Sequence, residues 1–150
     1  MAQVKIPARD IILQVAESDG TTWTEIGGLT AVKPNPGENE ETANTTDYDS
    51  GGEFEQLVMQ RGASLSMEGK LLKDSSTGVQ DAGQARCEVL STGTGYASRG
   101  KLRFRYPLDT SWKVWEATFS LKEQGGETND TSAWACNATR CGASTSVAVS

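Results

Sequence analysis

The side chains that most often perform catalysis or bind metals are sparse in this sequence. It contains no histidine, which is the commonest general base and metal ligand. Its three cysteines, Cys87, Cys136 and Cys141, cannot complete a tetrahedral site without a fourth sulfur or nitrogen ligand. The Gly-Thr-Gly of residues 93–95 lacks the following Lys-Ser/Thr of a phosphate-binding loop. The sequence therefore predicts no catalytic residues, no metal site and no cofactor, and the chain is expected not to be an enzyme.

Carboxylate ligands for a calcium ion are the remaining chemical alternative. Asp47, Asp49, Glu53 and Glu55 lie close together in the sequence. Their spacing does not match a calcium-binding loop, so we interpret them as acids in solvent.

Length and charge narrow the class of protein. A chain of 150 residues is long enough for one domain with an ordinary hydrophobic core. Its net charge of −6 disfavours tight binding to nucleic acid, which needs an excess of Lys and Arg. The odd cysteine count favours reduced thiols, with a Cys136 to Cys141 bridge as the alternative. No signal peptide or membrane span is evident, so we expect a soluble compartment and no membrane contact.

Residues 99–121 predict the central element of the fold. Leu102, Phe104, Tyr106 and Leu108 alternate with polar residues, and Trp115, Ala117, Phe119 and Leu121 repeat the pattern after a polar break. Period two is typical of a half-buried strand. A turn over residues 109–112 pairs the two runs in an antiparallel hairpin and places Arg105 opposite Glu116.

The other segments predict a mainly β fold, an antiparallel β-sandwich or barrel flanked by one α-helix. Strands are expected at residues 11–16, 22–26, 29–33, 63–71 and 131–139. A helix is expected at about residues 77–91, where Thr77 and Gln80 fit a capping box and Gly93 offers a stop. Residues 1–10 form an N-terminal arm and residues 142–150 a tail of small residues.

The segment 34–60 predicts a long, largely irregular loop, with a weak strand only at residues 41–46. It contains seven acids and no Lys or Arg. Because long loops in compact domains are usually functional or disordered, two alternatives stand: a solvated loop, or one that docks on a neighbouring subunit. Exposed apolar side chains favour docking. The proposed inter-subunit residues are Glu38, Glu40, Glu41, Asp47, Tyr48, Asp49, Phe54 and Leu57, with Val58 and Met59 as further apolar groups.

Arg99, Lys101, Arg103 and Arg105 form the one concentrated basic stripe. Three interpretations stand: a solvated outer sheet face with local ion pairs, nucleic-acid binding, or contact with an acidic surface of another copy, which residues 38–55 would provide.

The order of elements resembles the major tail tube protein of long-tailed, siphovirus-type bacteriophages. The resemblance covers nearly the whole chain and is carried by ARDIILQV, WTEIGGLTAV, the acidic loop with TTDYDSGG, SLSMEGKL, the single helix, the hairpin and the last strand. It implies a β-sandwich with one helix, hexameric rings stacked into a tube, and a loop and terminal arms that join subunits.

The resemblance also implies location and partners. The protein would be part of the virion tail, assembled in the cytoplasm of the host bacterium. Its partners would be other copies of itself, the tape measure, terminator and distal tail proteins, and phage DNA that passes through the lumen during ejection without specific binding. The polar faces of two strands are candidates for the lumen lining: Ser64, Ser66, Glu68, Glu116, Thr118 and Ser120.

Two other classes of protein remain as alternatives. A monomeric β-sandwich binding, adhesion or decoration module of a virion would stay a monomer at all concentrations. An enzyme would need a pocket with paired titratable groups, which the absence of His disfavours.

Overall fold

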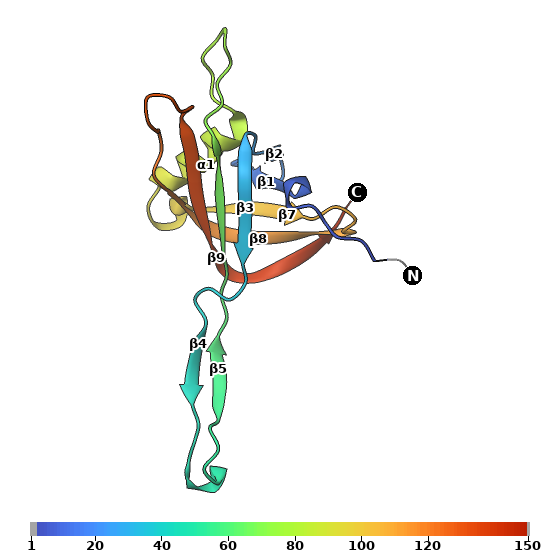
Figure 1. Ribbon diagram of the computed structural model, residues 1–150, viewed down its shortest axis with the longest axis vertical. Helices are drawn as coiled ribbons and strands as arrows, with labels where there is room; N and C mark the ends of the chain where they lie inside the picture. Colours follow the sequence, from blue (N-terminus) through green and yellow to red (C-terminus); the bar gives the residue numbers. More distant parts are fainter. Residues whose placement is uncertain (1–2, 150) are drawn as a thin grey trace.

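The computed structural model describes residues 3–149, and there it consists mainly of antiparallel β-sheet with one α-helix against it (Figure 1). Seven strands form the main sheet in the order β2-β1-β7-β8-β9-β6-β3. The bounds are β1 Ile12–Ala16, β2 Trp23–Glu25, β3 Leu29–Asn35, β6 Ser64–Lys70, β7 Arg99–Arg105, β8 Ser111–Leu121 and β9 Ala133–Ala148. A separate two-stranded sheet pairs β4 (Glu41–Asn44) with β5 (Gln56–Gln60). The predicted mainly β fold with one flanking helix is confirmed.

The main sheet folds over itself because its two longest strands bend. In Figure 1, β3 and β6 run along the long axis of the molecule, whereas β7 and β8 run across it. The register of β8 against β9 shifts between Val114 and Glu116, and Gly142 in β9 has a φ of 78°. A bulge of this kind bends a strand pair. The sheet therefore encloses a core as a sandwich does, but β2 and β3 remain edges and no closed barrel forms.

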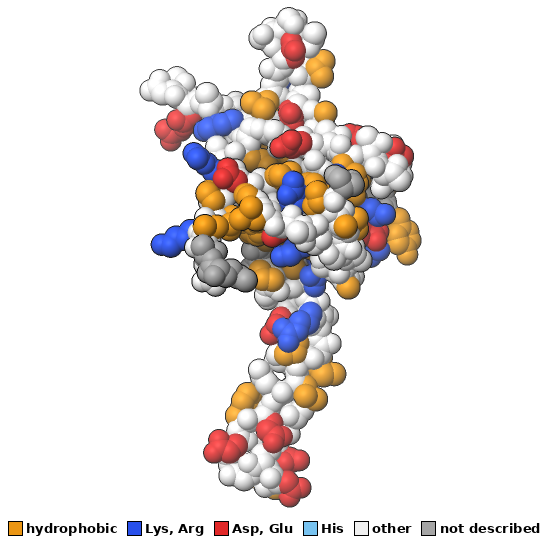
Figure 2. Space-filling view, turned by 90° about the vertical axis from the view of Figure 1, so that its right-hand side faces the viewer, with side chains coloured by type: hydrophobic (Ala, Val, Ile, Leu, Met, Phe, Trp, Pro, Cys, Tyr) orange, Lys and Arg blue, Asp and Glu red, His pale blue; other side chains and the backbone are white. Residues whose placement is uncertain are grey.

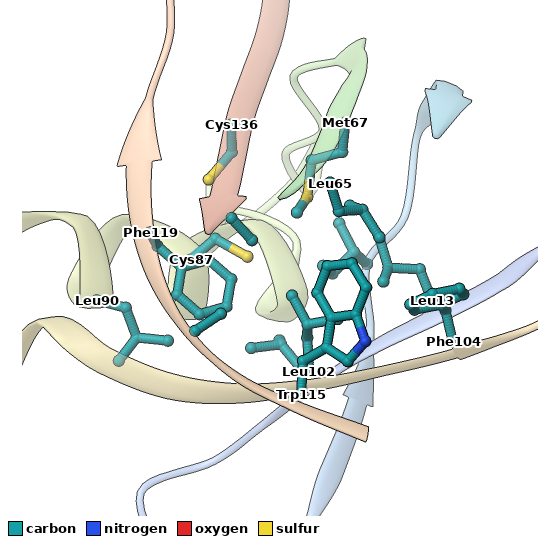
Figure 3. Packing of buried hydrophobic residues seen from close by; sticks show 14 of the residues in the cluster. Leu13, Leu65, Met67, Cys87, Leu90, Leu102, Phe104, Trp115, Phe119 and Cys136 are labelled. Atoms are coloured by element: carbon teal, nitrogen blue, oxygen red, sulfur yellow. The ribbon is translucent and has the colours of Figure 1, made fainter. Parts of the chain in front are cut away.

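The core lies between the two halves of the folded sheet and the helix (Figure 3). Leu102, Phe104 and Trp115 come from one half, and Phe104 meets Trp115 edge to face with ring centroids 5.2 Å apart. The other half and the helix contribute Leu65, Met67, Cys136, Cys87 and Leu90. Each large apolar side chain buried in this way stabilises the fold by about 1.5–3 kcal/mol.

The helix α1 (Ala82–Thr92) begins five residues later than predicted. The expected caps belong to a preceding turn, where the Asp74 carboxylate accepts hydrogen bonds from the backbone of Ser76 and Thr77. The true N-cap is Asp81, whose side chain accepts from the backbone N–H of Gln84. The predicted capping box is therefore wrong, because local side-chain bonds formed a turn rather than a helix start.

Gln84 fixes the helix to the sheet from inside the protein. Its side chain is fully buried and makes three hydrogen bonds. Its Oε1 accepts from the N–H of Leu72 at 3.2 Å, and its Nε2 donates to the carbonyls of Gly27 at 3.0 Å and Lys70 at 2.8 Å. A buried amide with all these bonds specifies one position for the helix.

The β7–β8 hairpin exists, but its register differs from the predicted one. Lys101, not Arg105, lies opposite Glu116, so the predicted Arg105 to Glu116 pair is wrong. The turn comes earlier because the Asp109 carboxylate accepts from the N–H of Tyr106 at 3.0 Å and closes a loop over residues 106–110. Trp112, predicted in the turn, therefore becomes part of β8.

The two ends of the chain are more ordered than predicted. Most of the expected tail, residues 142–148, belongs to β9 and pairs with the start of β8. In the expected arm, η1 (Ala8–Asp10) contacts β3. Residues 1–2 of the arm and residue 150 of the tail lie outside the described residues. Between residues 3 and 149, no helix has the length and apolar character to cross a membrane.

Candidate functional site and assembly surfaces

The predicted loop 34–60 is an extended β-hairpin that projects from the body along the long axis (Figure 1). The expectation of a largely irregular segment is wrong, because β5 supplies a second strand that pairs with β4. The far end carries the short helix η2 (Tyr48–Ser50). The segment is therefore an ordered β-hairpin and not an irregular loop.

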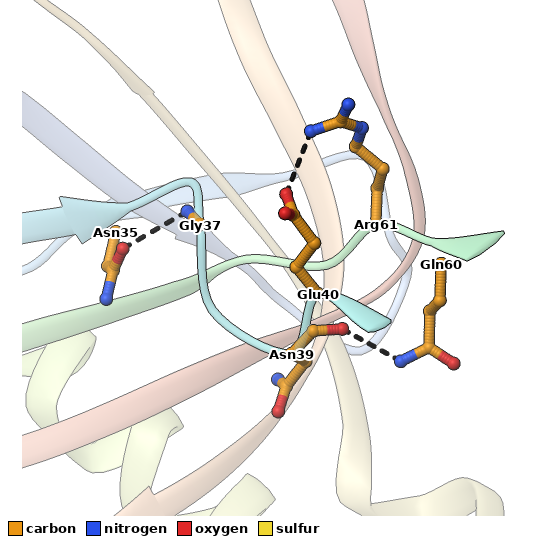
Figure 4. A network of polar contacts seen from close by, with 6 residues as sticks. All are labelled: Asn35, Gly37, Asn39, Glu40, Gln60 and Arg61. Atoms are coloured by element: carbon orange, nitrogen blue, oxygen red, sulfur yellow. Dashed lines mark hydrogen bonds and ion pairs between the residues drawn. The ribbon is translucent and has the colours of Figure 1, made fainter. Parts of the chain in front are cut away.

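Polar contacts stiffen the hairpin at its base (Figure 4). Arg61 Nη1 lies 2.9 Å from Glu40 Oε2, and Gln60 Nε2 donates to the carbonyl of Asn39 at 2.8 Å. Asn35 Oδ1 accepts from the N–H of Gly37 at 3.1 Å. Both strands are therefore tied together where the arm leaves the body.

A second set of bonds orders the far end of the hairpin. Thr46 Oγ1 accepts from the N–H of Glu55 at 2.8 Å and donates to the carbonyl of the same residue at 3.2 Å. Ser50 Oγ donates to the Asp47 carboxylate at 3.1 Å. The tip is thus held by the hairpin's own residues.

The hairpin has one apolar face that its own chain does not cover. Ala43 lies opposite Leu57, and Met59 follows on the same side of β5. Leu57 is 59% exposed and Met59 67% exposed. On the other face, Thr42 lies opposite Val58. An amphipathic strand pair with nothing against its apolar side is typical of a binding surface.

All eight loop residues proposed from the sequence lie exposed on this hairpin: Glu38, Glu40, Glu41, Asp47, Tyr48, Asp49, Phe54 and Leu57. Figure 2 shows acidic side chains gathered around its far end and apolar ones along its length. Sequence reasoning missed the division into two faces, since this depends on the pairing of β4 with β5.

The basic stripe on β7 is split by contacts within the chain. The Arg103 guanidinium lies between two tryptophans, with its Cζ 4.4 Å from the Trp23 ring centroid and 4.2 Å from that of Trp112. Its Nε donates to Gln14 Oε1 at 2.8 Å. The Arg105 Cζ lies 5.0 Å from the centroid of the same Trp112 ring. Burial lowers the pKa of Arg103.

Arg103 and Arg105 therefore stabilise the outer face of the sheet through cation–π contacts. Arg99 and Lys101 remain exposed, and Lys101 faces Glu116 across the hairpin. Sequence reasoning missed Trp23 and Trp112 as partners of Arg103. A tryptophan on the outer face of a strand favours a partner that packs against its ring, so the sequence did contain a signal. Identifying Arg103 as that partner required the correct register of β7 against β8.

The structure brings most of the predicted lumen residues onto one polar face. Ser64 and Thr118 both pair with Thr139, from opposite sides of β9. Ser66 and Ser120 both pair with Asn137 in the same way. Short uncharged side chains therefore form two rows across β6, β9 and β8.

The two predicted acids lie at opposite ends of this polar face. Glu68 pairs with Ala135 and Glu116 with Cys141. Asn137 and Thr139 were missed because only pairing between strands distant in sequence places β9 between β6 and β8. In the sequence, the polar residues Asn137 and Thr139 alternate with the apolar residues Cys136 and Ala138, which are buried. This alternation was the signal that could have identified them.

Neither of two clefts described in the body, between residues 3 and 149, brings buried reactive groups together. One, of about 330 Å³, lies between η1, β1 and β3 and is lined largely by apolar residues and glycines. The other, of about 400 Å³, has Glu68, Lys70, Lys122 and Glu123 on its rim, all exposed. Among residues 3–149, no group of three or more His, Cys, Asp or Glu is arranged to hold a metal ion.

The three cysteines are free, and two of them are buried together in the core. A hydrogen bond with Cys136, together with burial, raises the pKa of the Cys87 thiol well above its usual value. A thiol held neutral and away from solvent is a poor nucleophile, so Cys87 acts as an apolar packing group.

Two solved structures share this fold. One is the tail of an empty gene transfer agent particle obtained with helical refinement and C6 symmetry, with a TM-score of 0.68, 21% identity, and coverage of 98% of this chain and all of the other. The second is the virion of a native gene transfer agent particle, with a TM-score of 0.65, 21% identity and the same coverage. No protein-family model and no curated protein matches the chain. Nearly the whole chain therefore has the fold of a chain in a phage-like tail.

Proposed function

We propose that this protein is the structural subunit of a phage-like tail tube, in which single-domain copies form rings, hexameric in our proposal, that stack along one axis. The observation that carries the proposal is the fold, which agrees over 98% of the chain with a subunit of a tail solved in C6 symmetry. In such an assembly the subunit acts by shape and self-contact, without a catalytic residue, metal or cofactor.

The projecting hairpin supports self-assembly on physical grounds. Leaving Leu57 and Met59 in water forgoes the stabilisation that burial of each would give, about 1.5–3 kcal/mol per side chain. A head-to-tail contact in which every copy both gives and receives such an arm generates a ring or a filament. In the proposed assembly, the hairpin of each copy docks on a neighbouring copy.

The polar face of β6, β9 and β8 is the proposed lining of the lumen. Short hydroxyl and amide side chains, such as Ser66, Asn137 and Ser120, carry no charge, so the middle of this face offers DNA phosphates no cation to bind. Lys33, which pairs with Ser66, and Arg99, which pairs with Thr118, lie at the two borders of the face. The net charge of −6 adds repulsion of the DNA backbone. DNA would then pass during ejection without adhering.

The proposed setting is the virion tail, assembled in the host bacterial cytoplasm. There the end rings would meet terminator and distal tail proteins, and the lumen would hold a tape measure protein before DNA. The exposed Arg99 and Lys101 are candidate contacts with the acidic hairpin of another copy, through charge complementarity.

Negative-stain electron microscopy of the purified full-length protein tests the proposal. We expect rings or tubes with a central hole. The variant Leu57→Ser with Met59→Ser should remain folded but form no tubes. The matched control, Thr42→Ser with Gln56→Ser on the opposite hairpin face, should assemble as the original protein does. A protein that stays monomeric at all concentrations would instead fit a separate binding or decoration module and contradict the proposal.

A further inference from the structure

The sheet has an open seam at the place where it fails to close. β2 pairs with β1 from Gln14 to Ala16, and the N–H of Ile26 donates to the carbonyl of Leu13 at 3.3 Å, so Ile12 at the start of β1 has no strand partner on that side. Across the gap, β3 pairs with β6 on one side only. The cleft of about 330 Å³ lies between these two elements, with η1 at one end.

The floor of this seam is apolar and only half covered. Ile11, Leu29 and Val32 line it, pack against the core and remain partly exposed. An edge strand with apolar neighbours and free backbone groups is a template for an added strand. The seam therefore has the chemistry to receive a strand that carries apolar side chains on one face.

The β4–β5 hairpin has the matching chemistry. Leu57 and Met59 form an apolar row on β5, whose other backbone edge is free. The charges of the seam are balanced, because Arg9 and Glu25 both line it and Arg9 Nε lies 3.8 Å from Asp10 Oδ1. The match between the hairpin and the seam is therefore one of apolar surfaces.

The strands of the hairpin also run in a direction that allows them to pair with β3. In Figure 1, the hairpin and β3 both run along the long axis of the molecule, and the hairpin extends beyond one end of the body. Copies stacked along that axis would carry the hairpin of one copy alongside the body of the next, with its strands nearly parallel or antiparallel to β3. Pairing of strand edges needs such an alignment.

We propose that the seam between β1 and β3 is the receptor for the β4–β5 hairpin of a second copy, with Leu57 and Met59 covering Ile11, Leu29 and Val32. This inference rests on the proposed tube function and names the docking site within it. The added hairpin completes the folded sheet, so the edge strand β3 is exposed only at the end of a tube.

Site-directed crosslinking of the full-length protein tests the docking site. All variants carry Cys141→Ser, which removes the half-exposed native thiol and leaves the two buried ones. The test pairs add Val32→Cys, a partly exposed position that lines the seam on the core side of β3, to either Leu57→Cys or Met59→Cys. The control pair joins Met59→Cys to Ser120→Cys, an exposed position on the polar face. Each is treated with a short bis-maleimide after assembly, as judged by electron microscopy, and analysed on denaturing gels.

The account predicts a ladder of crosslinked dimers and higher multimers for at least one test pair, and monomer for the control and for each single-cysteine variant. Tubes that form normally but give no ladder with either test pair would overturn the seam as the docking site while leaving the tube function in place. A ladder from the control pair alone would place the hairpin on the polar face and overturn both the seam and the proposed lumen. If the parent Cys141→Ser protein forms no rings or tubes, the proposed function fails, and the seam proposal fails with it.

Discussion

The hairpin and the body of this molecule use the same strand chemistry with opposite outcomes. In the body, apolar side chains such as Leu102 and Leu65 are fully buried by the folding of one sheet over itself. In the hairpin, every residue of β5 is exposed, and the ordering contacts are polar ones at the base and tip. The body thus buries most of its large apolar side chains within one chain, while the hairpin has an apolar face that its own chain leaves exposed.

This contrast separates two kinds of apolar position in one sequence. Buried positions in the body stabilise the fold, and the exposed apolar positions in the hairpin are the ones that we propose to act in assembly. Substitutions of the same type in the two regions should therefore have different consequences.

The largest effect should come from matched leucine truncations. Leu102→Ala removes a fully buried side chain and should lower the free energy of unfolding by about 2–5 kcal/mol. Leu57→Ala should change it by about 0.5 kcal/mol or less in the isolated chain, because the side chain is already in solvent. Urea unfolding followed by tryptophan fluorescence measures both. Equal losses would mean that the hairpin packs on its own body in solution.

Matched glutamine truncations should give the next largest difference. Gln84→Ala leaves buried backbone groups of Leu72, Gly27 and Lys70 without partners and should cost about 1–3 kcal/mol. Gln60→Ala removes one exposed hydrogen bond and should cost about 0.5 kcal/mol or less. Thermal unfolding by circular dichroism compares the two. A small effect at Gln84 would show that the helix is held in place by packing alone.

A smaller effect is expected for the ion pair at the base of the hairpin. Arg61 and Glu40 are partly in solvent, so their coupling should be about 0–1 kcal/mol and should weaken as salt screens it. A double-mutant cycle with Arg61→Ala and Glu40→Ala, at low and high salt, measures this coupling. A strong, salt-independent coupling would contradict the description of the hairpin as a solvated arm.

The smallest effect concerns pH and the turn before the helix. Hydrogen bonds from Ser76 and Thr77 lower the pKa of Asp74 from 3.8 to about 2. A carboxylate whose pKa is lowered by folding stabilises the turn above pH 3.8 and loses that contribution as pH falls from 3.8 toward 2. Titration of the Asp74 carboxyl by NMR should give a midpoint near 2, and a midpoint at 3.8 would mean that the turn is open in solution.

The sequence was sufficient to predict features that depend on local patterns. Alternation at residues 99–121 and 63–71 predicted strands that the structure contains as β7, β8 and β6. The prediction that the even-numbered apolar residues of β7 share a face with the odd-numbered apolar residues of β8 was also correct, because Leu102 pairs with Trp115. The presence of one helix was correct as well.

Other features depended on competition between local signals. Asp109 and Asp74 each make side-chain bonds that close a turn, and these turns moved the β7–β8 register and delayed the helix. The Leu57, Val58, Met59 run gave no alternation, so β5 was missed. The strand β9 continues into residues 142–148 because β8 offers it an edge, which composition could not reveal.

The sequence identified which residues form the candidate surfaces, but it did not show how those residues are arranged in space. All the proposed hairpin residues are exposed, yet the apolar row of Leu57 and Met59 exists only once β4 and β5 pair. Likewise, Ser64 and Thr118 meet across Thr139, a residue whose place in the middle of the sheet is set by tertiary structure.

A chain-tracing reconstruction of the assembled protein by electron cryo-microscopy tests the central claim most directly. The account predicts a tube in which Leu57 and Met59 of one copy are buried against another copy and the row of Ser66, Asn137 and Ser120 faces the central hole. A tube whose hairpins extend into solvent without a contact, or whose polar row lies on the outer wall, would contradict it.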